Sequence, residues 1–159
     1  MKNDLKYLNS SSKKYYCDSL FGEMDTNSID EEIKPTLEKI CKSDSFRTIF
    51  SKKGNHDIKQ RCFQSYIRLA YTLNGEELLK QEIIPFFSNK YNINGSSFTC
   101  KWNIPRIQIE RAVTKDNKGA KWLTDKNYFN ISNIEFRLEG GDDILHNNFW
   151  NDLGEKLNK

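Results

Sequence analysis

The sequence lacks the short motifs that mark the common nucleotide-dependent and hydrolytic enzymes. None of G-x-x-x-x-G-K-[ST], G-x-G-x-x-G, G-x-S-x-G and H-E-x-x-H occurs in its 159 residues. Histidine is scarce, with only His56 and His146, and no two of the four cysteines form a C-x-x-C pair. Zinc sites need closely spaced histidine and cysteine ligands, so we expect neither a metal site nor a cofactor.

Long apolar runs are also missing. No segment approaches the roughly 20 apolar residues that a membrane-spanning helix needs, and the first residues contain no apolar run of signal-peptide length. We therefore expect a cytoplasmic protein that does not enter a membrane. In a reducing compartment its cysteines would be buried free thiols, whereas an exported chain could form two disulfides. The cysteines are Cys17, Cys41, Cys62 and Cys100.

Aliphatic side chains are few, and aromatic ones replace part of them. Apolar residues make up 36% of the chain, but ten Phe, seven Tyr and three Trp each bury a large area. A chain of this length fits one domain and can bury a sizeable core without stabilising disulfides or metal ions. The composition predicts one small core beneath a heavily charged surface.

Charge of each sign is sorted along the chain, although the net charge is only +3. Residues 45–137 carry sixteen Lys and Arg against eight acids. Residues 18–44 carry eight acids against three Lys, and residues 138–159 carry five acids against two Lys. If this sorting persists in the folded protein, it creates separate basic and acidic surfaces that steer charged partners.

The first third of the chain is predicted to be helical after a polar start. Residues 1–27 are polar and aperiodic, which is typical of an arm or a loosely docked segment. Ser28 and Glu31 have capping-box spacing, and Pro35 either kinks the following helix or starts a second, shorter one. Apolar residues at helical spacing follow the cap; they are Ile29, Ile33, Leu37 and Ile40.

Residues 57–73 carry the strongest helical pattern, because their apolar side chains fall within one broad arc at 100° per residue. A short helical turn is predicted at 44–51, and a further helix at 76–84 that Pro85 ends or bends. The competing interpretation is a β-hairpin that turns at Asn74–Gly75.

The pattern changes to alternation after residue 95. Residues 96–138 predict about four antiparallel strands, and Asp142 or Asp143 then caps a closing helix over 143–157. We predict a single α+β domain over 28–159, with helices over 28–90 followed by the sheet and the C-terminal helix. No internal repeat is visible.

The basic centre supplies the candidate binding residues. Repeated cations are what phosphate backbones need, and aromatic side chains such as Trp122 could stack on bases if exposed. The same residues are also typical of an ordinary solvated face. The predicted binding set is Arg61, Gln64, Arg68, Arg106, Arg111, Lys115, Lys118, Lys121 and Trp122.

Candidates for catalysis are few. His56 lies beside Asp57 and could act as a general base, although Asp57 is also an ordinary helix N-cap. Glu110 and Glu135 lie on predicted strands and would share a sheet surface with Arg106, Gln108 and Arg137 if those strands are neighbours. Cross-strand ion pairs explain these residues more simply than a metal-dependent nuclease does. His146 is predicted to pack in the core.

These observations favour a small protein-binding module of the inhibitor, immunity-protein or antitoxin type. Aromatic and arginine side chains are enriched at interface hot spots, and the acidic stretches would suit a basic protein partner such as a nuclease toxin. A nucleic-acid-binding protein that uses residues 45–137 is the first alternative. A metal-dependent nuclease that uses His56 with Glu110 or Glu135 is the second.

Overall fold

The computed structural model describes residues 7–8, 31–53, 64–91, 105–114 and 131–159. Its first part contains the 3-10 turn η2 (Glu31–Ile33), helix α2 (Lys34–Cys41) and strands β1 (Phe46–Lys53) and β2 (Gln64–Tyr71). A continuous helical segment follows as α3 (Leu73–Leu78), the π-helical turn η3 (Leu79–Ile83) and α4 (Ile84–Tyr91). Strands β3 (Arg106–Thr114) and β4 (Ile131–Glu139) and helix α6 (Asp143–Lys156) complete the described elements.

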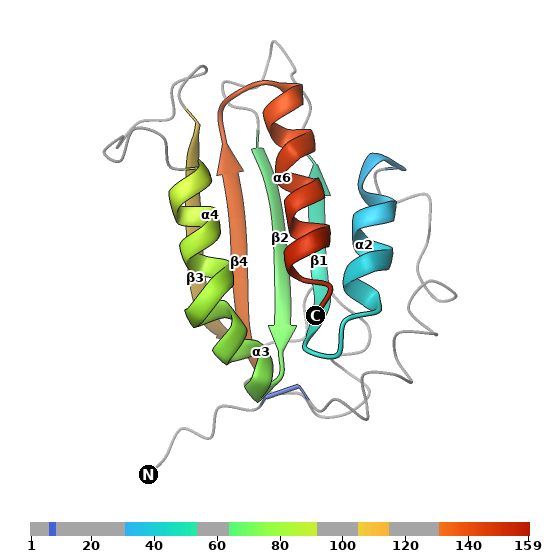
Figure 1. The fold of residues 1–159 in the computed structure, drawn as a ribbon, viewed down its shortest axis with the longest axis vertical. Coiled ribbons are helices and arrows are strands. Elements are labelled where there is room, and N and C mark those ends of the chain that lie inside the picture. The colour runs from blue at the N-terminus through green and yellow to red at the C-terminus, as the bar shows by residue number, and fades with distance from the viewer. Residues whose placement is uncertain (1–6, 9–30, 54–63, 92–104, 115–130) are drawn as a thin grey trace.

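The four described strands form one antiparallel sheet in the order β1-β2-β4-β3. Helices α2, α4 and α6 lie side by side on the same face of this sheet (Figure 1). The fold is therefore α+β with an antiparallel sheet and a C-terminal helix, as predicted. No helix among the described residues is both long and apolar enough to cross a membrane.

The arrangement contains a repeat that the sequence did not reveal. An antiparallel strand pair followed by a helix occurs twice, first as β1, β2 and α3–α4 and then as β3, β4 and α6. The second strand of each unit lies in the centre of the sheet, where β2 and β4 pair antiparallel. Exchanging the two units leaves the strand order unchanged, so the sheet has the topology of a twofold repeat about the β2–β4 pair.

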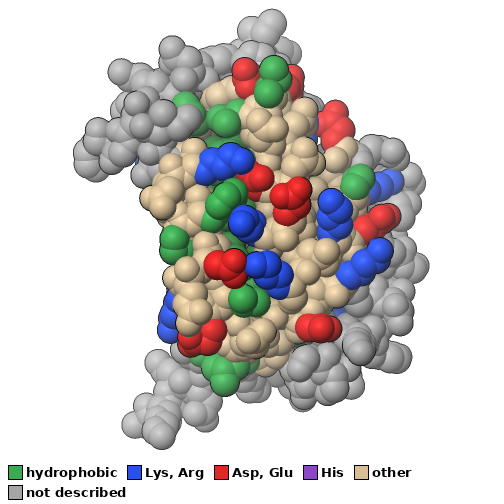
Figure 2. Space-filling view, viewed as in Figure 1, with side chains coloured by type: hydrophobic (Ala, Val, Ile, Leu, Met, Phe, Trp, Pro, Cys, Tyr) green, Lys and Arg blue, Asp and Glu red, His purple; other side chains and the backbone are tan. Residues whose placement is uncertain are grey.

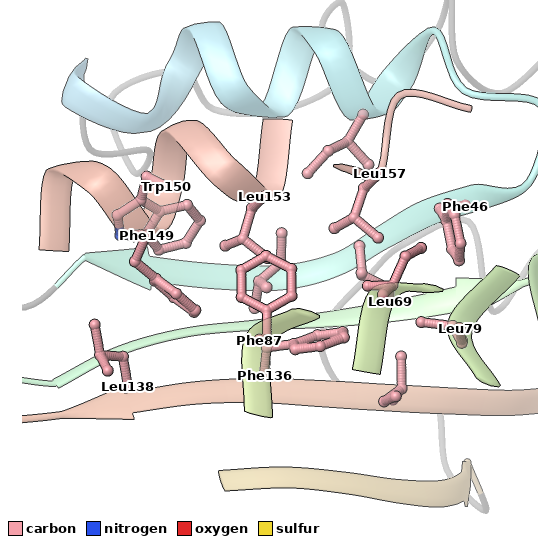
Figure 3. Close-up of a cluster of buried hydrophobic side chains, with 14 of the residues drawn as sticks. Phe46, Leu69, Leu79, Phe87, Phe136, Leu138, Phe149, Trp150, Leu153 and Leu157 are labelled. Atoms are coloured by element: carbon pink, nitrogen blue, oxygen red, sulfur yellow. The ribbon is translucent and has the colours of Figure 1, made fainter. Parts of the chain in front are cut away.

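The core lies between the sheet and the three helices. Alternate residues of the central strands face the helices, because successive side chains of a strand point to opposite faces. Phe87 of α4 lies between Phe136 of β4 and Phe149 of α6, with ring centroids 5.3 and 5.8 Å away (Figure 3). The other fully buried residues of this core include Ile67, Leu69, Ile134, Leu138, Leu153 and Leu157.

Two helical predictions are wrong. The segment predicted as the clearest helix, 57–73, contains strand β2, and the turn predicted at 44–51 overlaps strand β1. Ser65, Ile67 and Leu69 alternate with half-buried polar residues on β2. Pairing with a strand on each side satisfies the backbone of β2 and outweighs its helical pattern. The region 28–90 is thus not all helical, and strands and helices alternate instead.

The two prolines in helices are accommodated in different ways. Pro35 lies in the first turn of α2, where a missing N–H costs nothing, so a helix starts just before it. Pro85 neither ends nor sharply interrupts the second helical segment. The preceding turn widens to a π-helix in which the Ile84 N–H donates to the Leu79 carbonyl. A widened turn relieves the clash that a proline ring makes with the carbonyl four residues earlier.

The C-terminal helix agrees with its prediction. Asp142 caps it by accepting a hydrogen bond of 2.9 Å from the Leu145 N–H. The apolar stripe expected at every fourth residue is buried at Phe149, Leu153 and Leu157, whereas its first member, Leu145, is only partly buried against the core. The capping residue Ser28 and residues 96–104 and 115–130 of the predicted sheet region lie outside the described residues.

Part of the predicted N-terminal arm is docked. The Leu8 N–H donates to the Tyr71 carbonyl at 2.9 Å, and the Tyr7 hydroxyl donates to Glu76. Leu8 is buried. Residues 1–6 and 9–27 of the arm lie outside the described ranges.

Cysteine chemistry differs from the main expectation. Cys41, at the end of α2, is disulfide-bonded. The expectation of four free thiols is therefore wrong for Cys41. Its partner lies outside the described residues, because Cys41 is the one cysteine within them.

Candidate binding face of the sheet

The sheet surface opposite the helices carries a band of polar side chains, which we call the polar face. Its residues alternate with core residues along three neighbouring strands, so they point away from the helices. The polar face comprises Gln64, Tyr66 and Arg68 of β2, Asn133, Glu135 and Arg137 of β4, and Arg106, Gln108 and Glu110 of β3.

Strand register sets these residues in rows across the sheet. Arg68, Glu135 and Glu110 form one row, because Glu135 pairs with Arg68 on one side and with Glu110 on the other. The next row consists of Tyr66, Arg137 and Gln108. Glu110 and Glu135 were expected to share a sheet surface if their strands were neighbours, and the β3–β4 register places them opposite each other.

Glu135 is the centre of this face and is only 8% exposed. Its carboxylate accepts hydrogen bonds of 3.4 Å from Nε and Nη2 of Arg137, and Nη2 of Arg68 lies 3.7 Å from it. Arg68 also donates to the Asn133 side-chain oxygen. One carboxylate thus lies between two guanidinium groups, an arrangement that fixes both arginines and leaves the trio with a net charge of +1.

Arg137 is held from three directions. Its guanidinium carbon lies 4.7 Å from the centre of the Tyr66 ring, and its Nη1 donates to Gln64 Oε1 at 3.1 Å. Glu135 supplies the third contact. An arginine over an aromatic ring gains cation–π attraction, so this contact and the hydrogen bonds together restrain Arg137.

The β3 side of the polar face is open. Gln108 and Glu110 are exposed, whereas Arg106 is half-buried. Glu110 stands directly opposite Glu135 in the ladder, and within the part of the chain that the structure describes no ion pair joins Glu110 to another residue. Like charges directly opposite each other in a sheet repel, so Glu110 would gain from an added cation.

The predicted binding residues do not form one surface. Gln64, Arg68 and Arg106 belong to the polar face. Arg111 pairs with the core residue Ile134 and therefore points to the helix side, where its Nη1 lies 3.9 Å from Glu76. The rest of the set lies outside the described residues; it consists of Arg61, Lys115, Lys118, Lys121 and Trp122.

Charge sorting along the sequence does not persist in the described fold. Lys53 of the basic stretch pairs with Glu32 from the acidic segment before it. Lys90 pairs with Asp152 from the acidic C-terminal segment at 2.7 Å. Basic and acidic side chains accordingly intermingle on the helix side of the molecule (Figure 2). The condition for separate basic and acidic surfaces is therefore not met by these residues.

The described residues give little support for a catalytic or metal-binding site. Within the described ranges no three His, Cys, Asp or Glu side chains are grouped so that they could hold a metal ion. Glu110 and Glu135 face each other without a third ligand, and His56, the predicted general base, lies outside the described residues. The nuclease hypothesis thus has no assembled site among the residues described.

His146 is a core residue, as predicted. It is fully buried, and its Nε2 lies 2.7 Å from the Gly140 carbonyl, which requires Nε2 to carry the proton. Its Nδ1 therefore accepts from the Ser65 hydroxyl, also at 2.7 Å. Burial lowers the pKa of His146 to about 4, with nearby Lys53 acting in the same direction. The ring is neutral at physiological pH.

Sequence reasoning missed Tyr66 and Asn133 as members of the face. The helical interpretation of 57–73 placed Tyr66 on an apolar arc, although Gln64, Tyr66 and Arg68 alternate with Ser65 and Ile67. That alternation was the available signal, because polar residues at every second position mark one face of a strand.

Comparison with known proteins adds no assignment. No protein-family model, curated protein or solved structure matches this chain.

Proposed function

We propose that this chain is a protein-binding module of the inhibitor, immunity-protein or antitoxin type, and that the polar face is its contact surface. The proposal rests on the restraint of Arg137, whose guanidinium lies over the Tyr66 ring and is hydrogen-bonded to Glu135 and Gln64. Arginine and tyrosine dominate interface hot spots. Side chains already immobilised in the free protein lose less entropy on binding, which raises affinity.

The exposed end of the face suggests the chemistry of the partner. Glu110 is exposed and lies beside the net positive trio of Arg68, Glu135 and Arg137. A partner that places a lysine or arginine against Glu110, with acceptor groups over Arg137, would match this alternation of charge. A basic protein partner, such as a nuclease toxin, fits this description.

The nucleic-acid alternative is less well supported. Phosphate binding requires unpaired cations on one surface, whereas Arg68, Lys53 and Lys90 are each paired with an acid in this structure. Arg111 lies on the opposite side of the sheet from Arg68 and Arg106. These pairings favour a protein partner over a phosphate backbone.

The test is affinity capture from the native source with the folded chain and two charge-reversal variants. Glu110→Lys changes the exposed acid of the polar face, and Glu155→Lys changes an exposed acid of α6 on the helix side. We expect a stoichiometric partner that Glu110→Lys binds at least about tenfold more weakly, while Glu155→Lys binds it as the unmodified chain does.

Two results would contradict the proposal. One is equal loss of capture in both variants, which would place the contact elsewhere. The other is recovery of nucleic acid instead of protein, with binding that falls steeply as salt rises.

A further inference from the structure

Cys41 lies at a corner of the fold that links a helix to the sheet. It is the last residue of α2. Two residues later, the Ser43 hydroxyl accepts hydrogen bonds from the Ser45 and Phe46 N–H groups, at 3.0 and 3.2 Å, and β1 begins at Phe46. A covalent bond at Cys41 therefore fixes the end of α2 just where the chain enters the sheet.

Helix α2 is short and peripheral, so a disulfide at its end would add to its stability. It has eight residues and lies at the edge of the helix layer, beside β1 and α6 (Figure 1). Its buried residues are Thr36, Leu37 and Ile40, and the Thr36 hydroxyl donates to the Trp150 carbonyl at 2.9 Å. Helices this short are marginal without tertiary support, so a cross-link adds stability by restricting the unfolded chain.

We propose that this domain folds and acts in an oxidising compartment, such as the extracellular space, the endoplasmic reticulum lumen or a bacterial periplasm. Structural disulfides persist there, whereas glutathione and thioredoxin keep cytosolic thiols reduced. The cytoplasmic location expected from the sequence would leave the Cys41 bond to be reduced. This proposal goes beyond the proposed function, because it holds whatever the polar face binds.

The chemistry of the bond is ordinary thiol–disulfide exchange with a small disulfide, such as oxidised glutathione, as the oxidant. The Cys41 thiolate attacks one glutathione sulfur, forms a mixed disulfide and releases the first glutathione thiol. The thiolate of the second protein cysteine then attacks Cys41 Sγ and releases the other. Two protein thiols lose two protons and two electrons, and one glutathione disulfide becomes two glutathione thiols. The second cysteine is Cys17, Cys62 or Cys100.

The decisive measurement is the oxidation state of Cys41 in the cells that make the protein. Intact cells are treated with N-ethylmaleimide before lysis, and the chain is digested without reductant and mapped by mass spectrometry. We expect the peptide that holds Cys41 to be joined by a disulfide to a peptide that holds Cys17, Cys62 or Cys100. Recovery of Cys41 as its N-ethylmaleimide adduct would overturn the proposal.

A stability measurement on the oxidised, purified chain gives a second test. We expect a thiol reductant to lower the melting temperature by roughly 5–15 °C, the range for loss of a disulfide from a domain of this size. Cys41→Ser should lower it without reductant, and if that variant fails to fold, the reductant series on the unmodified chain still decides. An unchanged melting temperature after full reduction would contradict a structural role. Neither measurement depends on a binding partner, so their failure is distinct from failure of the proposed function.

Discussion

Single residues decide whether the polar face is a rigid platform. Glu135 neutralises part of the charge of Arg68 and Arg137 and is almost fully buried. Glu110 stands next to it in the same row but is exposed. Because both residues are glutamates and only Glu135 is buried, the same substitution at both positions separates the effect of burial from the effect of residue type.

We expect Glu135→Gln to lower the free energy of unfolding by about 1–3 kcal/mol, since the half-buried guanidinium groups of Arg68 and Arg137 lose their almost fully buried anionic partner. Glu110→Gln should change it by less than about 0.5 kcal/mol, because the side chain is exposed. Urea unfolding at pH 7 measures both values. Equal effects in the two variants would show that Glu135 does not organise the face.

His146 makes the stability of the domain depend on pH. Its pKa is about 4 in the folded state, against an ordinary value of 6.5, because burial disfavours the charged ring. Below pH 6.5, His146 is therefore protonated in the unfolded chain, whereas in the folded chain it stays neutral down to about pH 4. The stabilising contribution is complete above pH 6.5 and is lost as the pH falls, to a total on the order of 3 kcal/mol.

The expected result is a free energy of unfolding that decreases from pH 7 to pH 5, with a weaker decrease in His146→Gln. The Tyr7 hydroxyl lowers the pKa of Glu76, so that carboxylate contributes a loss of stability below about pH 4.5. Urea unfolding kept at pH 5 and above excludes that contribution. Identical pH profiles for the two proteins would refute the assignment.

At the scale of elements, two helical glycines provide a matched comparison. A Cβ atom on Gly75 of α3 would lie 2.7 Å from the Ser45 carbonyl oxygen, which is backbone and cannot easily move. A Cβ atom on Gly154 of α6 would meet Lys39 Cδ at 3.3 Å, part of a flexible side chain. Alanine in place of glycine favours a helix by up to about 1 kcal/mol. The surroundings of each glycine therefore decide whether the substitution stabilises or destabilises the protein.

We therefore expect Gly154→Ala to leave the melting temperature unchanged or raise it by a few degrees. Gly75→Ala should lower it, because α3 must move away from the start of β1 to make room. Differential scanning calorimetry of the two variants checks the contrast. A stabilising Gly75→Ala would mean that α3 is not held against Ser45.

Some helices and strands could be predicted from the sequence and others could not. The last helix was predictable because Asp142, Phe149, Leu153 and Leu157 combine a cap with one apolar stripe. The face-sharing of Glu110 and Glu135 followed from simple alternation on their strands. Strand β2 was not predictable in this way, since its helical arc and its alternation coexist and only pairing with β1 and β4 selects the strand.

Over the whole molecule, folding mixes charges that the sequence keeps apart. Lys90 of α4 belongs to the first strand–strand–helix unit, and Asp152 of α6 belongs to the second. Lys90 Nζ lies 2.7 Å from Asp152, which also accepts a hydrogen bond from the Tyr91 hydroxyl. This contact joins α4 of the first unit to α6 of the second.

A double-mutant cycle with Lys90→Met and Asp152→Asn measures the coupling between these units. Met retains the length and apolar stem of Lys90 but not its charge, and Asn retains an oxygen that can accept from Tyr91. We expect an interaction free energy of roughly 0.3–1 kcal/mol at low salt, because the lysine is half exposed. It should shrink in 1 M NaCl, where the Debye length falls to about 3 Å. Additive single effects at low salt would show that the pair does not hold the units together, and that charges distant in sequence are not matched across the helix layer.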